Sequence, residues 1–253
     1  NGMKLSVLAT ALAFLVSGPV NAHASAPSNP AIAAAIADPG RPADDVKNDA
    51  TRKPGEVLEF AHVKRGDRVV DFIMGGGYFT RLLAGMVGTD GRVFAYQPAE
   101  FIAFRAQYGL DLKAVSDAHG NVSALSDPLA RLALPESVDV IFTAQNYHDL
   151  HISAFPANLA ESVNAALFKA LKPGGVLVVI DHAAASGSGP RDSNTLHRID
   201  PATVRMELER AGFTFEAESG LLRNPEDPHT QLVFDPAIRG KTDQFVYRFR
   251  KPR

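Results

Sequence analysis

Short apolar runs alternate with longer amphipathic segments between residues 68 and 180. The runs have the length and β-branched content of buried strands, which predicts strands over 68–72, 92–96, 121–124, 138–143 and 175–180. The segments between them carry apolar residues at helical spacing, which predicts helices over 78–87, 98–108 and 156–171. Strands that alternate with helices of this length build a parallel sheet that helices cover on both faces. The pattern therefore predicts an α/β fold.

The end of the chain has a different pattern. A predicted helix over 200–211 precedes two predicted strands, over 213–219 and 244–249. No helical segment separates these strands, so the last one can pair antiparallel as a hairpin partner. The polar stretch 224–242 is then predicted to be a long loop that connects the two hairpin strands.

The region before the first strand divides into two parts. Residues 25–43 are rich in Ala, Pro and Ser, which indicates a flexible tether without a core and with one or two helical turns at 31–37. Residues 44–63 have apolar positions at helical spacing and predict a helix or a pair of helices. Because no internal repeat and no further linker follow, the sequence predicts one domain over 44–253.

Residues 1–24 have the pattern of an expression remnant followed by a signal peptide. The two residues before Met3 are interpreted as the remnant, Lys4 supplies the positive charge, residues 5–16 are apolar or small, and small residues stand at 22 and 24. A membrane anchor or an N-terminal helix is the alternative, but an apolar run of this length spans only about 18 Å against about 30 Å of hydrocarbon. We therefore expect cleavage after residue 24, no integral membrane span in the mature chain, and a periplasmic or secreted protein.

Composition excludes several classes of protein. The chain is 45% hydrophobic and 21% charged, as in ordinary globular domains. Lys and Arg number 26 against 28 Asp and Glu, so no basic field exists to bind nucleic acid. The absence of Cys excludes disulfides, thiolate zinc sites and a cysteine nucleophile. The oligomeric state is not predicted.

Three consecutive glycines, Gly75, Gly76 and Gly77, follow the first predicted strand, which contains Asp71. In an open α/β sheet the ligand lies where strands end and helices begin, and glycines let the backbone approach it closely. The helix that follows offers free N–H groups to an anion. A plain strand-to-helix turn is the alternative. The nicotinamide pattern G-x-G-x-x-G is absent, because Thr80 stands at its last position.

The chain resembles the class I S-adenosylmethionine-dependent methyltransferases in two stretches. These are residues 57–84 and Leu-Lys-Pro-Gly-Gly at 171–175, before the fifth strand. Residues 142–150 look like those of a small group of predicted, often exported, bacterial methyltransferases. The resemblance implies a Rossmann-like fold, with a mostly parallel seven-stranded sheet, an antiparallel last strand and helices on both faces. It also implies S-adenosylmethionine as cofactor and a set of cofactor-binding residues, Asp71, Gly75, Gly76, Gly77, Gln97, Asp127 and Asn146.

Two positions depart from the family pattern. Gln97 stands where the family has an acid that accepts both ribose hydroxyls, and a neutral amide offers at best one hydrogen bond in its place. Ile73 occupies the first glycine position of the turn. Asp127, after the third strand, is expected either to accept the adenine amino group or to form a turn before Pro128.

Polar residues follow the fourth and fifth strands and are expected to meet at the ligand edge of the sheet. We predict His148 as general base for the methyl acceptor, Tyr147 or Asn146 as the group that orients it, and Asp149 as a group that orients the His148 ring or caps the next helix. The alternative is that these groups only satisfy strand and loop ends.

The ligand types at this edge also suit zinc, manganese or iron, but their spacing matches no recognised motif, and no metal is predicted. The residues considered for such a site are His148, Asp149, His151, Asp181 and His182. The sequence thus predicts a methyltransferase that acts on a small-molecule acceptor. The alternative is a non-catalytic or diverged exported ligand-binding protein on a methyltransferase scaffold.

Overall fold

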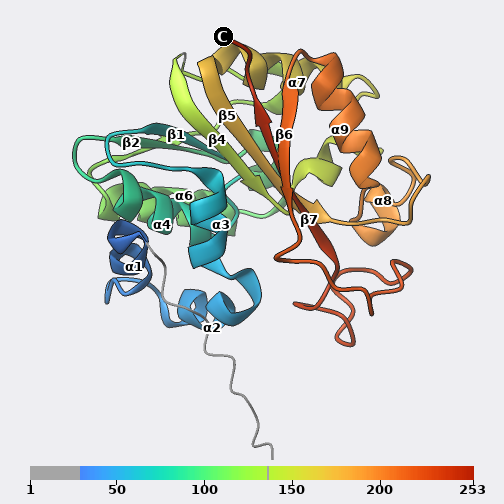
Figure 1. Ribbon diagram of the computed structural model, residues 1–253, viewed down its shortest axis with the longest axis horizontal. Helices are drawn as coiled ribbons and strands as arrows, with labels where there is room; N and C mark the ends of the chain where they lie inside the picture. Colours follow the sequence, from blue (N-terminus) through green and yellow to red (C-terminus); the bar gives the residue numbers. More distant parts are fainter. Residues whose placement is uncertain (1–28, 136) are drawn as a thin grey trace, which may run out of the picture.

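The computed structural model describes residues 29–135 and 137–253, which contain a seven-stranded sheet in the order β3-β2-β1-β4-β5-β7-β6 (Figure 1). The strands are β1 (Arg68–Phe72), β2 (Arg92–Tyr96), β3 (Val122–Leu125), β4 (Val138–Ala144), β5 (Leu171–His182), β6 (Thr214–Ser219) and β7 (Gln244–Arg250). The α-helices are α1 (Pro30–Ile36), α2 (Ala43–Arg52), α3 (Pro54–Ala61), α4 (Tyr78–Val87), α5 (Ala99–Phe104), α6 (Gln107–Ala118), α7 (Leu159–Ala170), α8 (Ser193–Leu196) and α9 (Pro201–Arg210). Two short 3₁₀ helices are η1 (Leu129–Arg131) and η2 (Tyr147–His151).

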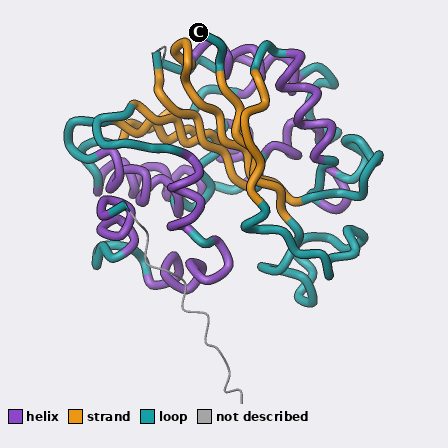
Figure 2. Tube along the Cα trace, viewed as in Figure 1, coloured by secondary structure: helices purple, strands orange, loops and turns teal. Residues whose placement is uncertain are grey.

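Strands β1 to β5 run parallel, and β7 lies antiparallel between β5 and β6. Figure 2 shows the strands as one continuous twisted layer with helices on its two sides. This arrangement confirms the Rossmann-like methyltransferase fold that the sequence predicts, including the antiparallel hairpin at the end of the chain. Its consequence is that β1, β4 and β5 deliver their carboxyl ends to one edge of the sheet.

Alternate residues of the central strands face two separate apolar cores. In β1, Val69 packs in the core formed with α1, α3, α4 and α6, whereas Val70 packs in the core formed with η2, α7 and α9. Both valines are fully buried. The near-continuous apolar runs of the central strands follow from this burial on both faces.

The expectation of a tether without a core over 25–43 is wrong for the part that the structure describes. Helix α1 begins after Asn29, whose side chain accepts a hydrogen bond from the Ala31 N–H at 2.9 Å. Ile32 and Ala35 are buried against α4, where Gly85 leaves room for the Ala35 side chain. An Ala-rich segment has a weak hydrophobic signal, so its apolar face was not apparent in the sequence.

Two helices differ from the predicted boundaries. The helix expected over 98–108 is α5, which ends where Arg105 becomes extended with φ −143°. Helix α6 then begins at Gln107 and continues to Ala118, whereas the predicted helix ended at residue 108. The expected helix pair over 44–63 is present as α2 and α3, separated by Lys53 in a left-handed conformation.

The predicted signal peptide lies outside the described residues. Among the residues that the structure describes, no helix combines the length and the apolar composition that a membrane crossing needs.

Candidate functional site

A cavity of about 940 Å³ lies at the carboxyl ends of β1, β4 and β5. The turn after β1, residues 73–76, forms one end, and η2 with His182 of β5 forms the other. Helices α2 and α5 and the β6–β7 connection supply the remaining walls. The strand order of the fold therefore brings the two candidate regions of the sequence to one cavity.

The turn after β1 combines three residues with positive φ: Ile73 (63°), Gly75 (58°) and Gly77 (84°). A β-branched residue rarely adopts such a conformation, so Ile73 takes the backbone shape of the glycine it replaces. Its side chain is buried in the core. A Cβ on Gly75 would meet no atom of residues 29–135 and 137–253 within 4 Å, so the turn is open where it faces the cavity.

Asp71 lies at the end of β1, where its carboxylate accepts a hydrogen bond of 2.6 Å from the Thr80 hydroxyl. The side chain is buried, and it lines the cavity. Burial raises the pKa of Asp71 to about 6, although the Thr80 hydrogen bond and the charge of Arg52 oppose the rise. Asp71 therefore holds the turn and helix α4 together at the cost of a buried charge.

Gln97 lies beneath the glycine turn and is not among the residues that line the cavity. Its Oε1 accepts a hydrogen bond from the Gly75 N–H at 2.9 Å, and its Nε2 is buried without a hydrogen-bond partner among the described residues. Asp127, the second expected cofactor ligand of this region, is exposed and lies outside the cavity; its carbonyl accepts from the Tyr96 hydroxyl. The structure thus brings neither side chain to the site that the sequence predicts for it.

Charged residues besides Asp71 line the cavity near the turn, among them Glu100 and Arg52, and the sequence did not single out Glu100. Glu100, on α5, faces the cavity while its carboxylate accepts from the Leu129 N–H at 3.1 and 3.2 Å. Arg52, at the end of α2, lies over the Tyr78 ring at 4.5 Å and donates to the Gln145 side chain at 3.1 Å. Helix α2 therefore turns the Arg52 side chain toward the cavity.

Asn146 and Tyr147 follow β4, but only the first reaches the cavity. Asn146 donates to the carbonyls of Ile73 and Ala144 and so ties the end of β4 to the glycine turn. The Tyr147 ring points into the core, where its hydroxyl donates to Glu207 at 2.8 Å and accepts from Asn164 at 2.7 Å. The Tyr147 hydroxyl therefore does not reach the cavity, where the sequence predicts that it orients the methyl acceptor.

His148 lies in the cavity wall and is paired with Asp181 of β5. The His148 Nδ1–H donates to Asp181 Oδ1 at 2.9 Å, and the His148 backbone N–H donates to Oδ2 at 2.7 Å. Burial alone would lower the pKa of His148, but the charge and hydrogen bonds of Asp181 and the charge of Asp149 raise it above its ordinary value. Burial also opposes ionisation of Asp181, yet His148 holds its pKa below the usual range.

Two more titratable side chains face His148 Nε2. Asp149 Oδ1 is 3.4 Å from that nitrogen, and burial raises the pKa of Asp149 to about 6 against the opposing charge of His148. His197, at the end of α8, has its Nδ1 3.1 Å from the same nitrogen. Burial, reinforced by the charge of His148, lowers the pKa of His197.

His182 also lines the cavity, and it completes the group of histidines at this end. Its Nδ1 is 2.7 Å from the Thr242 hydroxyl, and burial lowers its pKa to about 3 against the opposing charge of Asp181. Such a side chain stays neutral at physiological pH.

Known proteins with similar sequences are methyltransferases. No family model matches the chain. It is 30% identical over 123 residues to a protein-L-isoaspartate O-methyltransferase of Ignicoccus hospitalis, which covers 49% of this chain and 51% of that protein. It is 24% identical over 192 residues to a ubiquinone/menaquinone biosynthesis C-methyltransferase of Erwinia tasmaniensis, which covers 74% of this chain and 72% of that protein. The chain thus spans about half the length of the first of these relatives.

Solved structures give the same picture of the fold. A SAM-dependent methyltransferase from Aquifex aeolicus superposes with a TM-score of 0.56 at 23% identity, covering 83% of this chain and 98% of that one. The chain has the Rossmann-like methyltransferase fold. In this fold the cavity described above lies at the strand ends where ligands bind in open α/β sheets.

Proposed function

We propose that the protein is an S-adenosylmethionine-dependent methyltransferase that acts on a small-molecule acceptor. The observation that carries the proposal is the single cavity that joins the glycine turn after β1 to the His148–Asp181 pair. S-adenosylmethionine, when bound, supplies an electrophilic methyl group. The residues of the chain bind the donor at one end and hold and deprotonate the acceptor at the other.

The residues at the glycine turn fit the donor. Open space next to Gly75 and the N-terminus of α4 provide a close approach for the donor's amino-acid part, and Arg52 brings a positive charge for its carboxylate. Because Gln97 is used beneath the turn, we assign the ribose hydroxyls to Glu100, whose carboxylate faces the cavity from α5. Ionised Glu100 offers the two acceptor oxygens that Gln97 lacks.

At the other end, His148 is the general base. Asp181 accepts the Nδ1–H, which leaves the Nε2 lone pair to take a proton from an acceptor hydroxyl or amine. Asp181 also raises the pKa of the ring, which makes His148 a stronger base than a free imidazole. Asp149, 3.4 Å from Nε2, helps to hold the proton there once it is transferred.

The walls between the two ends favour an apolar acceptor. Aromatic side chains that line the cavity come from α5, from the segment after η2 and from the β6–β7 connection: Phe101, Phe104, Phe155 and Phe234. Phe104 is 89% exposed and Phe234 53% exposed, so both have surface to lose to a ligand. A cavity of about 940 Å³ is at the upper end of the range for small-molecule sites and has room for a donor and a small acceptor.

Two further features of the proposal rest on the sequence. The pattern of residues 1–24 supports export, with the domain acting in the periplasm or outside the cell. The replacement of the family acid by Gln97 favours a second candidate, a ligand-binding protein on this scaffold without turnover.

Calorimetry of the protein with S-adenosylmethionine and with its demethylated product tests the proposal. We expect one donor per chain, and about tenfold weaker binding in Glu100→Gln because a charge-assisted hydrogen bond becomes neutral. Glu161→Gln, an exposed substitution on α7, is the control and should bind as the parent does. Absence of binding in the parent protein would refute the methyltransferase proposal. Donor binding without turnover on any acceptor would favour the second candidate.

A further inference from the structure

Three side chains of ligand type meet at the His148 end of the cavity: His148, Asp149 and His197. His148 Nε2 is 3.1 Å from His197 Nδ1 and 3.4 Å from Asp149 Oδ1, and His197 Nδ1 is 3.9 Å from the same oxygen. A tetrahedral ion with bonds of about 2.0–2.1 Å holds its ligand atoms roughly 3.4 Å apart. The three observed separations bracket that value, so shifts of a few tenths of an ångström would complete the set.

We propose that His148 Nε2, His197 Nδ1 and Asp149 Oδ1 bind one divalent transition-metal ion such as Zn²⁺. Two imidazoles and one carboxylate suit zinc and its neighbours, whereas Mg²⁺ and Ca²⁺ prefer sites made of oxygen. All three side chains line the cavity, so the remaining coordination position faces it. Three protein ligands with an open fourth position are typical of a site that contacts substrate rather than of a closed structural site.

Asp181 orients the first of these ligands. Its carboxylate is fully buried and accepts three hydrogen bonds, from His148 Nδ1 and from the backbone N–H groups of His148 and His182. A carboxylate on the far nitrogen of a metal-binding histidine fixes the tautomer, so that the near nitrogen presents its lone pair. Asp181 therefore orients the His148 ring in the way that a carboxylate orients a metal-binding histidine.

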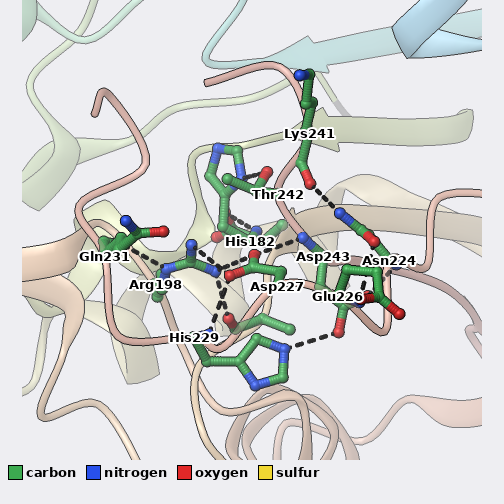
Figure 3. A network of polar contacts seen from close by, with 12 residues as sticks. His182, Arg198, Asn224, Glu226, Asp227, His229, Gln231, Lys241, Thr242 and Asp243 are labelled. Carbon is green, nitrogen blue, oxygen red and sulfur yellow. Dashed lines mark hydrogen bonds and ion pairs between the residues drawn. The ribbon is translucent and has the colours of Figure 1, made fainter. Parts of the chain in front are cut away.

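The second ligand is fixed through its neighbour in sequence, Arg198. This guanidinium is fully buried, pairs with Asp227 at 2.8 Å and donates to the carbonyls of Ala183 and Gln231. Figure 3 shows Arg198 at the centre of a network that joins the chain after α8 to the β6–β7 connection. Because Arg198 cannot move without breaking this network, His197 keeps its place opposite His148, with its ring 5.0 Å from that of Phe234.

The inference goes beyond the proposed function, because binding of the ion requires neither the donor nor turnover. The same Nε2 lone pair serves either a proton or an ion. In the loaded protein the ion, rather than His148, would favour loss of the proton from an acceptor hydroxyl that reaches the open position.

Titration of the full chain with Zn²⁺, and with Co²⁺ followed by visible absorption, tests the site. We expect one ion per chain and the intense absorption bands of low-coordinate Co²⁺. His197→Ala and Asp149→Asn should abolish stoichiometric binding, and Asp181→Asn should weaken it about 10- to 100-fold. His119→Ala removes a partly buried histidine at the end of α6 and should leave binding unchanged.

Other outcomes overturn the site. If neither ion binds at one equivalent, the 3.1 Å contact of His148 and His197 is an imidazole–imidazole hydrogen bond and nothing more. If His197→Ala retains the ion, the ion is held elsewhere. Circular dichroism establishes that each variant is folded, and His197→Gln replaces His197→Ala if the latter is not. Donor calorimetry on metal-free protein separates failure of the metal site from failure of the methyltransferase proposal.

Discussion

The two ends of the cavity use their polar groups in different ways. At the glycine turn the polar side chains bond to the protein itself: Asp71 to Thr80, Gln97 to the Gly75 N–H, and Asn146 to two carbonyls. At the other end His148 Nε2, Asp149 and His197 face one another in the cavity wall. Apart from Arg52 and Glu100, the turn therefore offers a ligand backbone and shape, whereas the His148 end offers titratable atoms.

This difference explains which departures from the family pattern the fold tolerates. A site made of backbone depends on φ and ψ, and Ile73 adopts the positive φ that a glycine would adopt at this position. Gln97 can replace an acid because its main contact is the Gly75 N–H beneath the turn. Substitutions at the His148 end would instead change which protons and ions the cavity can hold. The predictions below separate shape, charge and chemistry at the two ends.

The largest effect is expected for His148→Asn. The Asn side chain keeps a donor near the position of Nδ1, so the buried Asp181 retains a partner, but the Nε2 lone pair is lost. General-base help is worth about 10²- to 10⁴-fold, so turnover on an identified acceptor should fall by that factor. Donor affinity, measured by calorimetry, should stay unchanged because the donor is proposed to bind at the other end. Full turnover in the variant would show that the cavity works by proximity alone.

A second large effect concerns the buried charge at the turn. Burial raises the pKa of Asp71 to about 6 from 3.8 in the unfolded chain, so the native state favours the neutral acid. The native protein thus loses stability as pH rises from about 4 to 6. Above pH 6 the buried Asp71 carboxylate lowers the free energy of unfolding by its full amount, about 3 kcal/mol. Asp71→Asn lacks this penalty.

We expect the free energy of unfolding of Asp71→Asn, relative to that of the parent, to increase by about 3 kcal/mol between pH 4 and pH 8. Urea unfolding at the two pH values measures this difference. A difference that does not change with pH would mean that Asp71 ionises as freely in the folded protein as in the unfolded one. Thr80→Val is a useful companion because it removes the hydrogen bond and should raise the penalty further.

How far the sequence predicts this molecule depends on the kind of signal. The strands, their order and the position of the glycine turn follow from periodicity and from the resemblance, because both reflect burial along the chain. His148 and Asp149 were predicted because they follow a strand end directly. Asp181 was placed at the same edge, but its bond to His148 depends on how β4 and β5 align.

His197 was missed for a physical reason. It lies 49 positions from His148 in a polar segment without periodicity, and long-range contacts such as the Arg198–Asp227 pair and the Ala183–Ile199 bridge bring that segment over the strand ends. Glu100 was missed because a single acid on a helix is usually solvated. Gln97 and Asp127 were assigned through the family pattern, and side-chain direction, which spacing does not reveal, turns both away from the cavity.

The smallest expected effect tests shape at the turn. Gly76 lines the cavity with an ordinary φ, and among the described residues a Cβ there would approach only Asp111 Oδ2, at 4.0 Å, so we expect a larger side chain to fit the protein and to project toward the cavity. Gly76→Val should therefore fold normally and weaken donor binding about 10- to 100-fold, as expected for 1–3 kcal/mol of overpacking. Gly120→Val, at another open position outside the cavity, is the control.

The neighbouring glycine provides the contrast. At Gly77 φ is 84° and a Cβ would lie 2.7 Å from Val115 Cγ2, so Gly77→Ala should lower the melting temperature, whereas Gly76→Val should not. Thermal unfolding and donor calorimetry on both variants therefore distinguish the glycine that the ligand needs from the glycine that the fold needs. If Gly76→Val binds the donor as tightly as Gly120→Val does, the donor does not lie against the turn, and the shape-based account of that end fails.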